Sequence, residues 1–137
     1  MTVELVLTLP FLLIVLIAVV LFSQILMSDQ AVAAAASNGA REASQPGASE
    51  NSVRSAVLQT LDGWRLANDP NNVQVVIHVN GVSLADDPSA LETAVTGDVV
   101  EVSVKVATTD AVPDMLSAFG ISIAGSQLCK TFVEQKE

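Results

Sequence analysis

The hydrophobic and polar positions divide the chain into two unequal parts. Residues 1–28 hold 21 apolar residues and a single charged one, Glu4, and residues 5–28 are 24 consecutive residues without a charge. At a rise of about 1.5 Å per residue, this stretch as a helix reaches roughly 36 Å, enough to cross a hydrocarbon core of about 30 Å. The pattern therefore predicts a helix over residues 1–28 that spans or is anchored in a membrane.

A cleaved secretory signal is the alternative interpretation of this segment. Small residues of the kind that follow such a signal occur at 31–40, AVAAAASNGA. However, a signal's apolar region is typically about 7–15 residues long and follows a basic region. The apolar run here is longer, and no basic residue precedes it. A retained membrane helix is favoured.

Pro10 and Glu4 are unusual residues for a membrane helix. Pro10 removes a backbone donor and disfavours helical geometry at Leu9, so we expect a kink there, unless bending in the first turns costs little. Glu4 is either a charge at the positive end of the helix dipole or a carboxylate buried when helices bundle. A buried carboxylate needs a cation, and residues 1–40 contain no lysine or arginine. The amine of Met1, in the same or a neighbouring chain, is the nearest candidate.

Alanine dominates residues 29–44, up to the break at residues 45–47 (QPG). Its high helix propensity predicts that the membrane helix continues into water as one rod of about 40 residues. A narrow face of small side chains recurs at helical spacing: Val32, Ala36, Gly39 and Ala43. Such a face lets another backbone approach closely. That backbone belongs either to a sheet of the same chain or to a second helix, and core packing within the chain is favoured.

Residues 45–137 predict a small outer domain that begins with a helix. Ser49 caps this helix, which runs to about Leu66 and carries an apolar row on one face: Val53, Val57, Leu61 and Trp64. Residues 68–72 form a turn. Its oxygen-rich side chains do not have the spacing of an EF-hand, so turn chemistry explains them without calcium.

Strand patterns follow this turn. Residues 73–79 alternate apolar and polar positions before the turn dipeptide at 80–81, and residues 98–108 alternate in the same way. Asp86-Asp87-Pro88 predicts the cap and first turn of a short helix through Val95. Residues 121–134 predict a last strand, bent or bulged near Gly125. The order predicts an α+β fold with a long N-terminal hydrophobic helix on which a two- to four-stranded antiparallel sheet packs.

Charge and chemistry narrow the function. Outside residues 1–28 there are 14 acidic and 6 basic residues, a formal charge of −8 that repels nucleic acid. Cys129 is the single cysteine, so an intrachain disulfide and a thiol zinc cluster are excluded. His78, the single histidine, is predicted to face solvent or lie at a sheet edge. No phosphate loop, metal spacing or nucleophile motif occurs, so we predict no catalytic residue, metal or cofactor, and no enzyme.

The N-terminus resembles a known family. Val3-Glu4-Leu5, followed by Leu7-Thr8-Leu9-Pro10 and an unbroken apolar run, is similar to the start of TadE-like pilins of tight-adherence pilus systems. Residues 38–43 (NGAREA) are similar to the segment after the membrane helix in that family. Gly97-Asp98 with its alternating valines, and a closing strand ending at Glu134, fit the C-terminal region. The match is specific over residues 3–10, moderate over 31–43 and only a pattern beyond.

The resemblance implies a precursor that a prepilin peptidase cuts after a glycine, and delivery from the inner membrane into an extracellular pilus. It also implies a glutamate near the new N-terminus that pairs with an amine, and Glu4 matches that position. These families usually place the glutamate fifth after the cut. Here it is fourth, and neither a leader nor the glycine is present. Either the first mature residue is missing or the site is shifted, and a basic leader removed before residue 1 would explain the absent basic region.

The first hypothesis is therefore a structural subunit of a pilus or pilin-like filament, held in the inner membrane before assembly. Its parts are a transmembrane and assembly helix (1–28), a helix extension (29–44) and an outer domain (45–137). Its partners are copies of itself or related pilins in a helical polymer, the inner-membrane assembly machinery, the prepilin peptidase and the bilayer. The predicted assembly residues are Glu4, which pairs with the Met1 amine, Pro10, Leu5, Leu9, Phe11, Leu12, Leu13, Val15, Leu16, Val19, Val20 and Phe22.

A second hypothesis comes from a different class. The chain would be a single-pass membrane protein that does not polymerise and whose outer domain binds a partner or a small ligand.

Overall fold

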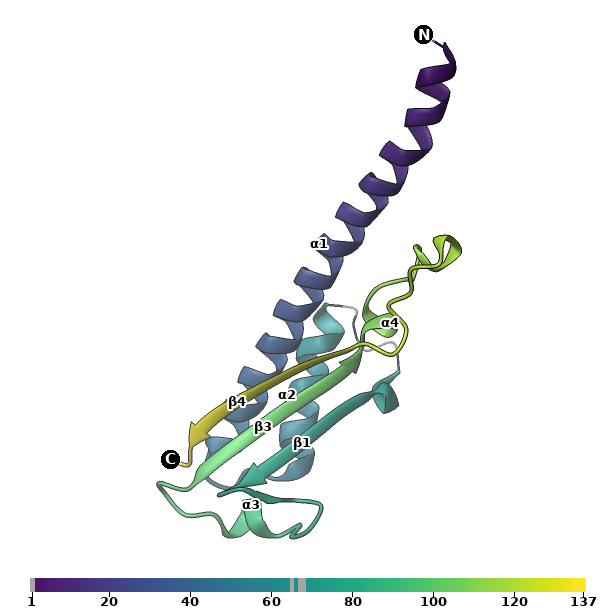
Figure 1. The fold of residues 1–137 in the computed structure, drawn as a ribbon. Helices are drawn as coiled ribbons and strands as arrows, with labels where there is room; N and C mark the ends of the chain where they lie inside the picture. Colours follow the sequence, from purple (N-terminus) through teal and green to yellow (C-terminus); the bar gives the residue numbers. More distant parts are fainter. Residues whose placement is uncertain (1, 65, 67–68) are drawn as a thin grey trace.

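The computed structural model of the chain describes residues 2–64, 66 and 69–137. A single helix, α1 (Thr2–Ser44), makes up the first third of the molecule. Its 43 residues correspond to about 65 Å of helix. Figure 1 shows its N-terminal half projecting alone, while its C-terminal half lies against the outer domain. The predicted rod of about 40 residues is confirmed.

Pro10 lies inside α1, and the helix is unbroken through it. The loosening expected at this position therefore does not interrupt the helix. Pro10 is the ninth residue of α1, so its missing N–H removes the hydrogen bond to the carbonyl oxygen of Val6, and the helix continues without that bond.

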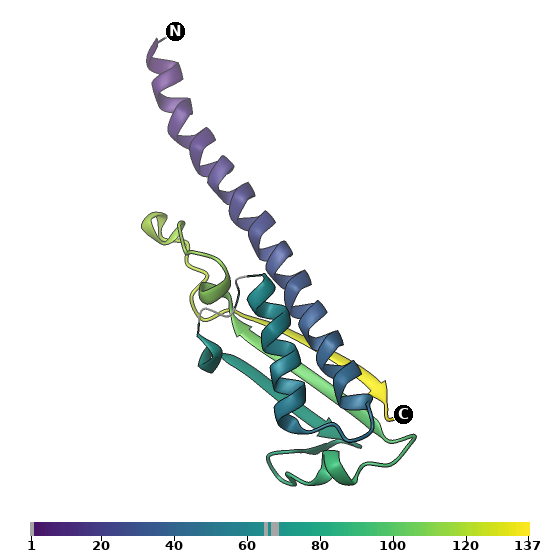
Figure 2. The ribbon, with the colours of Figure 1, turned by 180° about the vertical axis from the view of Figure 1, so that it is seen from behind.

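The outer domain has two layers. One layer is a four-stranded antiparallel sheet in the order β2-β1-β3-β4, built from β1 (Val73–Val79), β2 (Val82–Ser83), β3 (Val99–Ala107) and β4 (Gln127–Gln135). The other layer consists of the C-terminal half of α1 and the helix α2 (Glu50–Gly63), which lie on the same face of the sheet (Figures 1 and 2). α1 contacts β3 and β4, and α2 contacts α1 and β1. The predicted α+β class is confirmed.

The core lies between these layers and is built from small and β-branched side chains. The alternation predicted for β3 is confirmed, because Val100, Val102, Val104 and Val106 are at most 1% exposed. The small face of α1 packs within the chain, as favoured. A Cβ atom built on Gly39 would lie 2.7 Å from Val57 Cγ2 of α2 and 3.2 Å from Val102 Cγ1 of β3. The absence of a side chain at residue 39 therefore sets the approach of α1 to both neighbours.

The helix α2 begins as predicted and ends earlier than predicted. Ser49 is its N-cap: the Ser49 Oγ accepts a hydrogen bond from Ser52 N, and the Ser49 amide donates to Ser52 Oγ. Val53, Val57 and Leu61 are buried, but the helix ends at Gly63 instead of near Leu66. Trp64 is the C-cap and is 49% exposed. Its predicted place in the buried row was wrong, because the helical spacing stops at Gly63.

Three other boundaries differ from the prediction. The short helix α3 covers only Ala90–Thr93, and Ser89 is its N-cap. Asp87 does not cap the helix; its Oδ1 accepts hydrogen bonds from Ser89 N and Ser89 Oγ. Residues 121–126 are not strand, and Gly125, with φ of +88°, lies in the turn before β4. Asn68 of the predicted turn lies outside the described residues, and the rest of the turn is the short 3₁₀ helix η1 (Pro70–Asn72).

Candidate assembly surface

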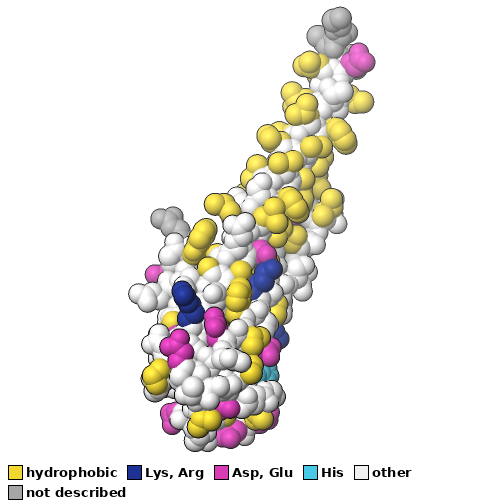
Figure 3. Space-filling view, turned by 90° about the vertical axis from the view of Figure 1, so that its left-hand side faces the viewer, with side chains coloured by type: hydrophobic (Ala, Val, Ile, Leu, Met, Phe, Trp, Pro, Cys, Tyr) yellow, Lys and Arg dark blue, Asp and Glu magenta, His cyan; other side chains and the backbone are white. Residues whose placement is uncertain are grey.

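The N-terminal half of α1 exposes almost all of its large side chains. Every predicted apolar assembly residue is exposed, from Val15 and Val20 at 46% to Phe11 at 72%. Val6, Leu7, Leu26 and Met27, which the prediction did not name, are exposed as well. Figure 3 shows hydrophobic side chains along this half of the helix, while charged side chains gather on the domain apart from one acidic group near the tip. Such a surface needs lipid or protein around it.

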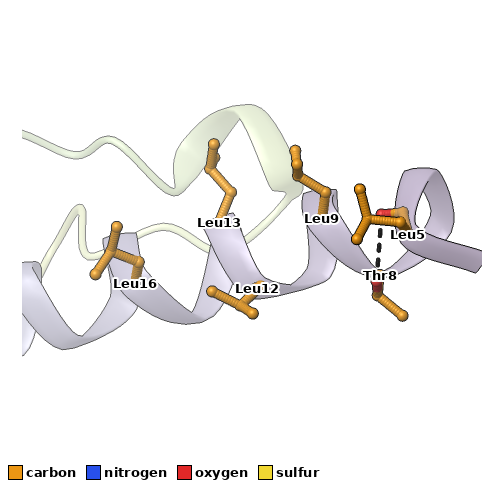
Figure 4. A pocket seen from close by; sticks show the side chains of 6 residues that line it. All are labelled: Leu5, Thr8, Leu9, Leu12, Leu13 and Leu16. Carbon is orange, nitrogen blue, oxygen red and sulfur yellow. Dashed lines mark hydrogen bonds between the residues drawn. The ribbon is translucent and has the colours of Figure 1, made fainter. Parts of the chain in front are cut away.

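Five of the predicted leucines come together on one side of the helix. Figure 4 shows an open groove lined by Thr8 and by Leu5, Leu9, Leu12, Leu13 and Leu16. Thr8 does not present a free donor there, because its Oγ1 donates to the carbonyl oxygen of Leu5 at 3.2 Å. The groove therefore offers apolar contact alone. Phe11, Val15, Val19, Val20 and Phe22 are exposed on α1 but do not line this groove.

Glu4 is exposed in the first turn of α1. This position places a negative charge at the positive end of the helix dipole. Met1, whose amine is its predicted partner, lies outside the described residues, so the pairing stays a prediction. Pro10 is exposed on the same apolar half.

An ion pair marks where the apolar surface ends. Lys130 Nζ of β4 lies 2.9 Å from Asp29 Oδ2 of α1, and both side chains are 37% exposed. Asp29 is the first charged residue after Glu4. The apolar half of α1 thus ends at a residue that is ion-paired with β4.

His78 is not at a sheet edge. β1 lies between β2 and β3, and His78 stands opposite Ser83 on one side and Glu101 on the other. It is half-buried, and its Nδ1 is buried without a hydrogen-bond partner among the described residues. The edge alternative was therefore wrong, whereas the half-buried side chain remains partly exposed to solvent. Its position between the buried Ile77 and Val79 does place it away from the helices, as alternation requires.

Neither Cys129 nor His78 forms part of a cluster that could hold a metal. Across residues 2–64, 66 and 69–137, no group of three or more His, Cys, Asp or Glu side chains is arranged for one. Cys129 is an exposed free thiol on β4. The same described residues contain one helix that is long and apolar enough to cross a membrane, and it is α1.

The segment that matches a known family is the one that carries the exposed apolar helix and the acid in its first turn. Residues 1–41 match the TadE-like family. The match covers the whole apolar half of α1 and most of the half that packs on the sheet. No curated protein and no solved structure is similar enough to the chain to be matched. The TadE-like segment and its apolar helix fit a pilus-related membrane protein.

Sequence reasoning missed two features outside α1: three exposed apolar side chains and one buried lysine. Met115, Phe119 and Ile121, in the connection from β3 to β4, are more than half exposed. Lys136 is 5% exposed, although lysine is rarely buried. The only sequence signal for the first group is the single charge in residues 112–126. Nothing local marks Lys136, because its partner lies on α1.

Proposed function

We propose that this chain is a structural subunit of a pilus or pilin-like filament, stored in the inner membrane and polymerised through the N-terminal half of α1. The observation that carries the proposal is the contrast along one unbroken helix. From Ala31 to Ala43 the helix supplies buried core residues to the domain, and between Glu4 and Leu21 most of its large side chains are exposed. The domain therefore holds one half of the helix, and the part of the chain that the structure describes leaves most of the apolar half uncovered.

The TadE-like match supports the same proposal, since it covers this rod. In the membrane, lipid covers the exposed leucines and phenylalanines. In a filament, the same side chains pack against the rods of neighbouring subunits at interaxial distances of about 8–10 Å. The negatively charged outer domain then faces water around the bundle.

The small free-energy gain of assembly explains why partner proteins are needed. Lipid tails are as apolar as leucine, so moving the rod from the bilayer into a bundle gains little hydrophobic free energy. Assembly from the membrane therefore requires an inner-membrane machine that supplies energy. Processing by a prepilin peptidase supplies the amine with which Glu4 pairs, and that pairing fixes the axial register of adjacent subunits.

Electron microscopy of sheared surface material, with antibodies raised against residues 45–137, tests the proposal. We expect labelled filaments in cells that express the chain and none in a strain from which it is deleted. Confinement of the chain to detergent-extracted membranes, with no labelled filament, would contradict polymerisation. It would instead support a non-polymerising single-pass membrane protein.

A further inference from the structure

The connection between β3 and β4 lies at the end of the domain nearest the projecting half of α1. It begins with the short helix α4 (Thr108–Ala111), which contacts α1, and passes through the 3₁₀ helix η2 (Ser117–Phe119). Figures 1 and 2 show this connection reaching along the molecule toward the projecting half of α1. The connection that contains α3 lies at the opposite end of the sheet.

The two ends of the domain differ in chemistry. At the end nearest the projecting half of α1, Met115, Phe119 and Ile121 are 54%, 52% and 57% exposed. Residues 112–126 contain one charged residue, Asp114, whereas residues 80–98 at the far end contain four acids. A loop that exposes three large apolar side chains and a single charge fits contact with an apolar partner.

The polar groups of this connection are largely satisfied within it. The Asp114 carboxylate is turned inward: its Oδ2 accepts hydrogen bonds from Ser122 Oγ at 2.5 Å and from Ile123 N at 3.3 Å. Its Oδ1 is buried without a hydrogen-bond partner among the described residues.

The backbone of the tip is bonded internally as well. The amides of Phe119 and Ile121 both donate to Leu116 O, and that of Gly120 donates to Ser117 O. Free amides are costly where water is scarce, so internal pairing lowers the cost of entering a bilayer surface.

The burial of Leu21 also indicates that part of the domain lies beside the apolar run of α1. Leu21 is 4% exposed, although its neighbours Val20 and Phe22 are 46% and 63% exposed. Neighbours on the helix alone do not bury a leucine to this extent, so the domain covers it. Leu21 precedes Asp29, the first charge after the apolar run, by eight residues, about 12 Å along the axis. Part of the domain therefore lies at the level of the apolar run.

A hollow beside Met27 shows which parts of the domain reach the end of that run. Ala111 and Pro113, at the start of the connection, line it together with Gln24 and Met27 of α1. Trp64 lines the same hollow and is 49% exposed. Tryptophan is enriched where membrane meets water, because its ring is apolar and its N–H is polar.

We propose that residues 113–124 enter the boundary between the headgroups and acyl chains of the bilayer beside α1. With Trp64, they form a second membrane contact that fixes the tilt and rotation of the outer domain on its helix. The inference rests on the membrane stage of the proposed function and does not depend on polymerisation.

Tryptophan fluorescence of the full chain in vesicles of phosphatidylcholine and phosphatidylglycerol tests this contact. Trp64 is the only tryptophan, so Trp64→Phe gives a silent background. Three single tryptophans are then compared: Phe119→Trp in the connection, Phe22→Trp in α1, and Val95→Trp at the far end, where Val95 is 65% exposed. The readouts are the emission maximum and quenching by phosphatidylcholine brominated near the headgroup end of its chains.

We expect Phe119→Trp to show blue-shifted emission and to lose most of its intensity to brominated lipid, as Phe22→Trp does, while Val95→Trp is unaffected. Phe119→Trp that behaves like Val95→Trp, while Phe22→Trp is quenched, overturns the loop contact and leaves membrane storage intact. Blue-shifted emission without lipid quenching assigns the loop to a neighbouring copy and also overturns the proposal. Absence of lipid quenching of Phe22→Trp overturns the membrane stage itself.

Discussion

The ammonium group of Lys136 donates a hydrogen bond to the main-chain carbonyl of Ala43, at 3.1 Å and across 93 positions of sequence. In the next residue, the amide of Glu137 donates to Ser44 O at 2.9 Å. Both carbonyls belong to the last turn of α1, where no partner exists within the helix. A cation there also lies at the negative end of the helix dipole. The residues after β4 therefore fasten the end of α1 to the sheet.

Replacing Lys136 by methionine keeps the buried stem and removes the donor. Because Ala43 O then loses a charged donor, we expect the free energy of unfolding to fall by about 1–2 kcal/mol. Urea unfolding of the full chain in detergent micelles, followed by far-ultraviolet circular dichroism, measures this. Lys105→Met, on the opposite face of the sheet, is the matched control and should change stability little. If Lys136→Met left the urea midpoint unchanged, the apolar stem of the side chain alone would hold the C-terminal end of α1.

Gly39→Ala tests the close contact between α1, α2 and β3. Alanine favours the helix by up to about 1 kcal/mol, but its Cβ would lie 2.7 Å from Val57 Cγ2. Valine side chains are stiff, so crowding should outweigh the gain and destabilise the chain by about 1–3 kcal/mol. Gly63→Ala, where nothing lies within 4 Å of the new Cβ, should leave the unfolding midpoint unchanged or raise it. Equal effects of the two substitutions would contradict tight packing at Gly39.

The hydrogen bonds of Asp98 predict that the stability of the domain depends on pH. Hydrogen bonds from the Asn80 side chain and from the Val95 amide lower the pKa of Asp98 below its ordinary value of 3.8. A lowered pKa means that the ionised group stabilises the fold above the ordinary value, and that this contribution is lost as pH falls through the folded-state pKa.

We therefore expect Asp98→Asn to lower the thermal midpoint at neutral pH and to make it less sensitive to pH below about 4. Asp62→Asn, at an exposed position of α2, is the control for removing an acid. Parallel pH profiles of wild type and Asp98→Asn would contradict a role for this carboxylate.

Glu4→Gln separates the assembly role of Glu4 from simple helix capping. Glu50 is the matched control, because it is an acid in the first turn of α2. If Glu4 only complements a helix dipole, both substitutions cost a similar few tenths to about 1 kcal/mol, and neither affects filaments. If Glu4 pairs with an amine, Glu4→Gln abolishes or disorders filaments seen by electron microscopy, whereas Glu50→Gln does not. Normal filaments with unchanged subunit spacing in Glu4→Gln would contradict the pairing.

Some features could be predicted because their cause is local. The valines of β3 alternate with polar residues, so their period of two shows which side is buried, and the strand (Val99–Ala107) differs from the prediction by one residue at each end. The positive φ angles at Asn80 (+51°) and Gly81 (+83°) fit the turn dipeptide predicted there. By contrast, Trp64 was misplaced because the spacing rule assumes a continuing helix, and Gly63 ends it.

The sequence by itself determined the apolar rod, the alternation of β1 and β3 and the Ser49 cap of α2, because hydrophobicity, side-chain alternation and capping act over a few neighbouring residues. Only the tertiary structure decided that Lys136 is buried against α1, that His78 is half-buried between two strands, and that the connection between β3 and β4 extends toward the rod. These outcomes depend on which segments meet across the fold. Contacts between residues that lie tens of positions apart leave no local pattern.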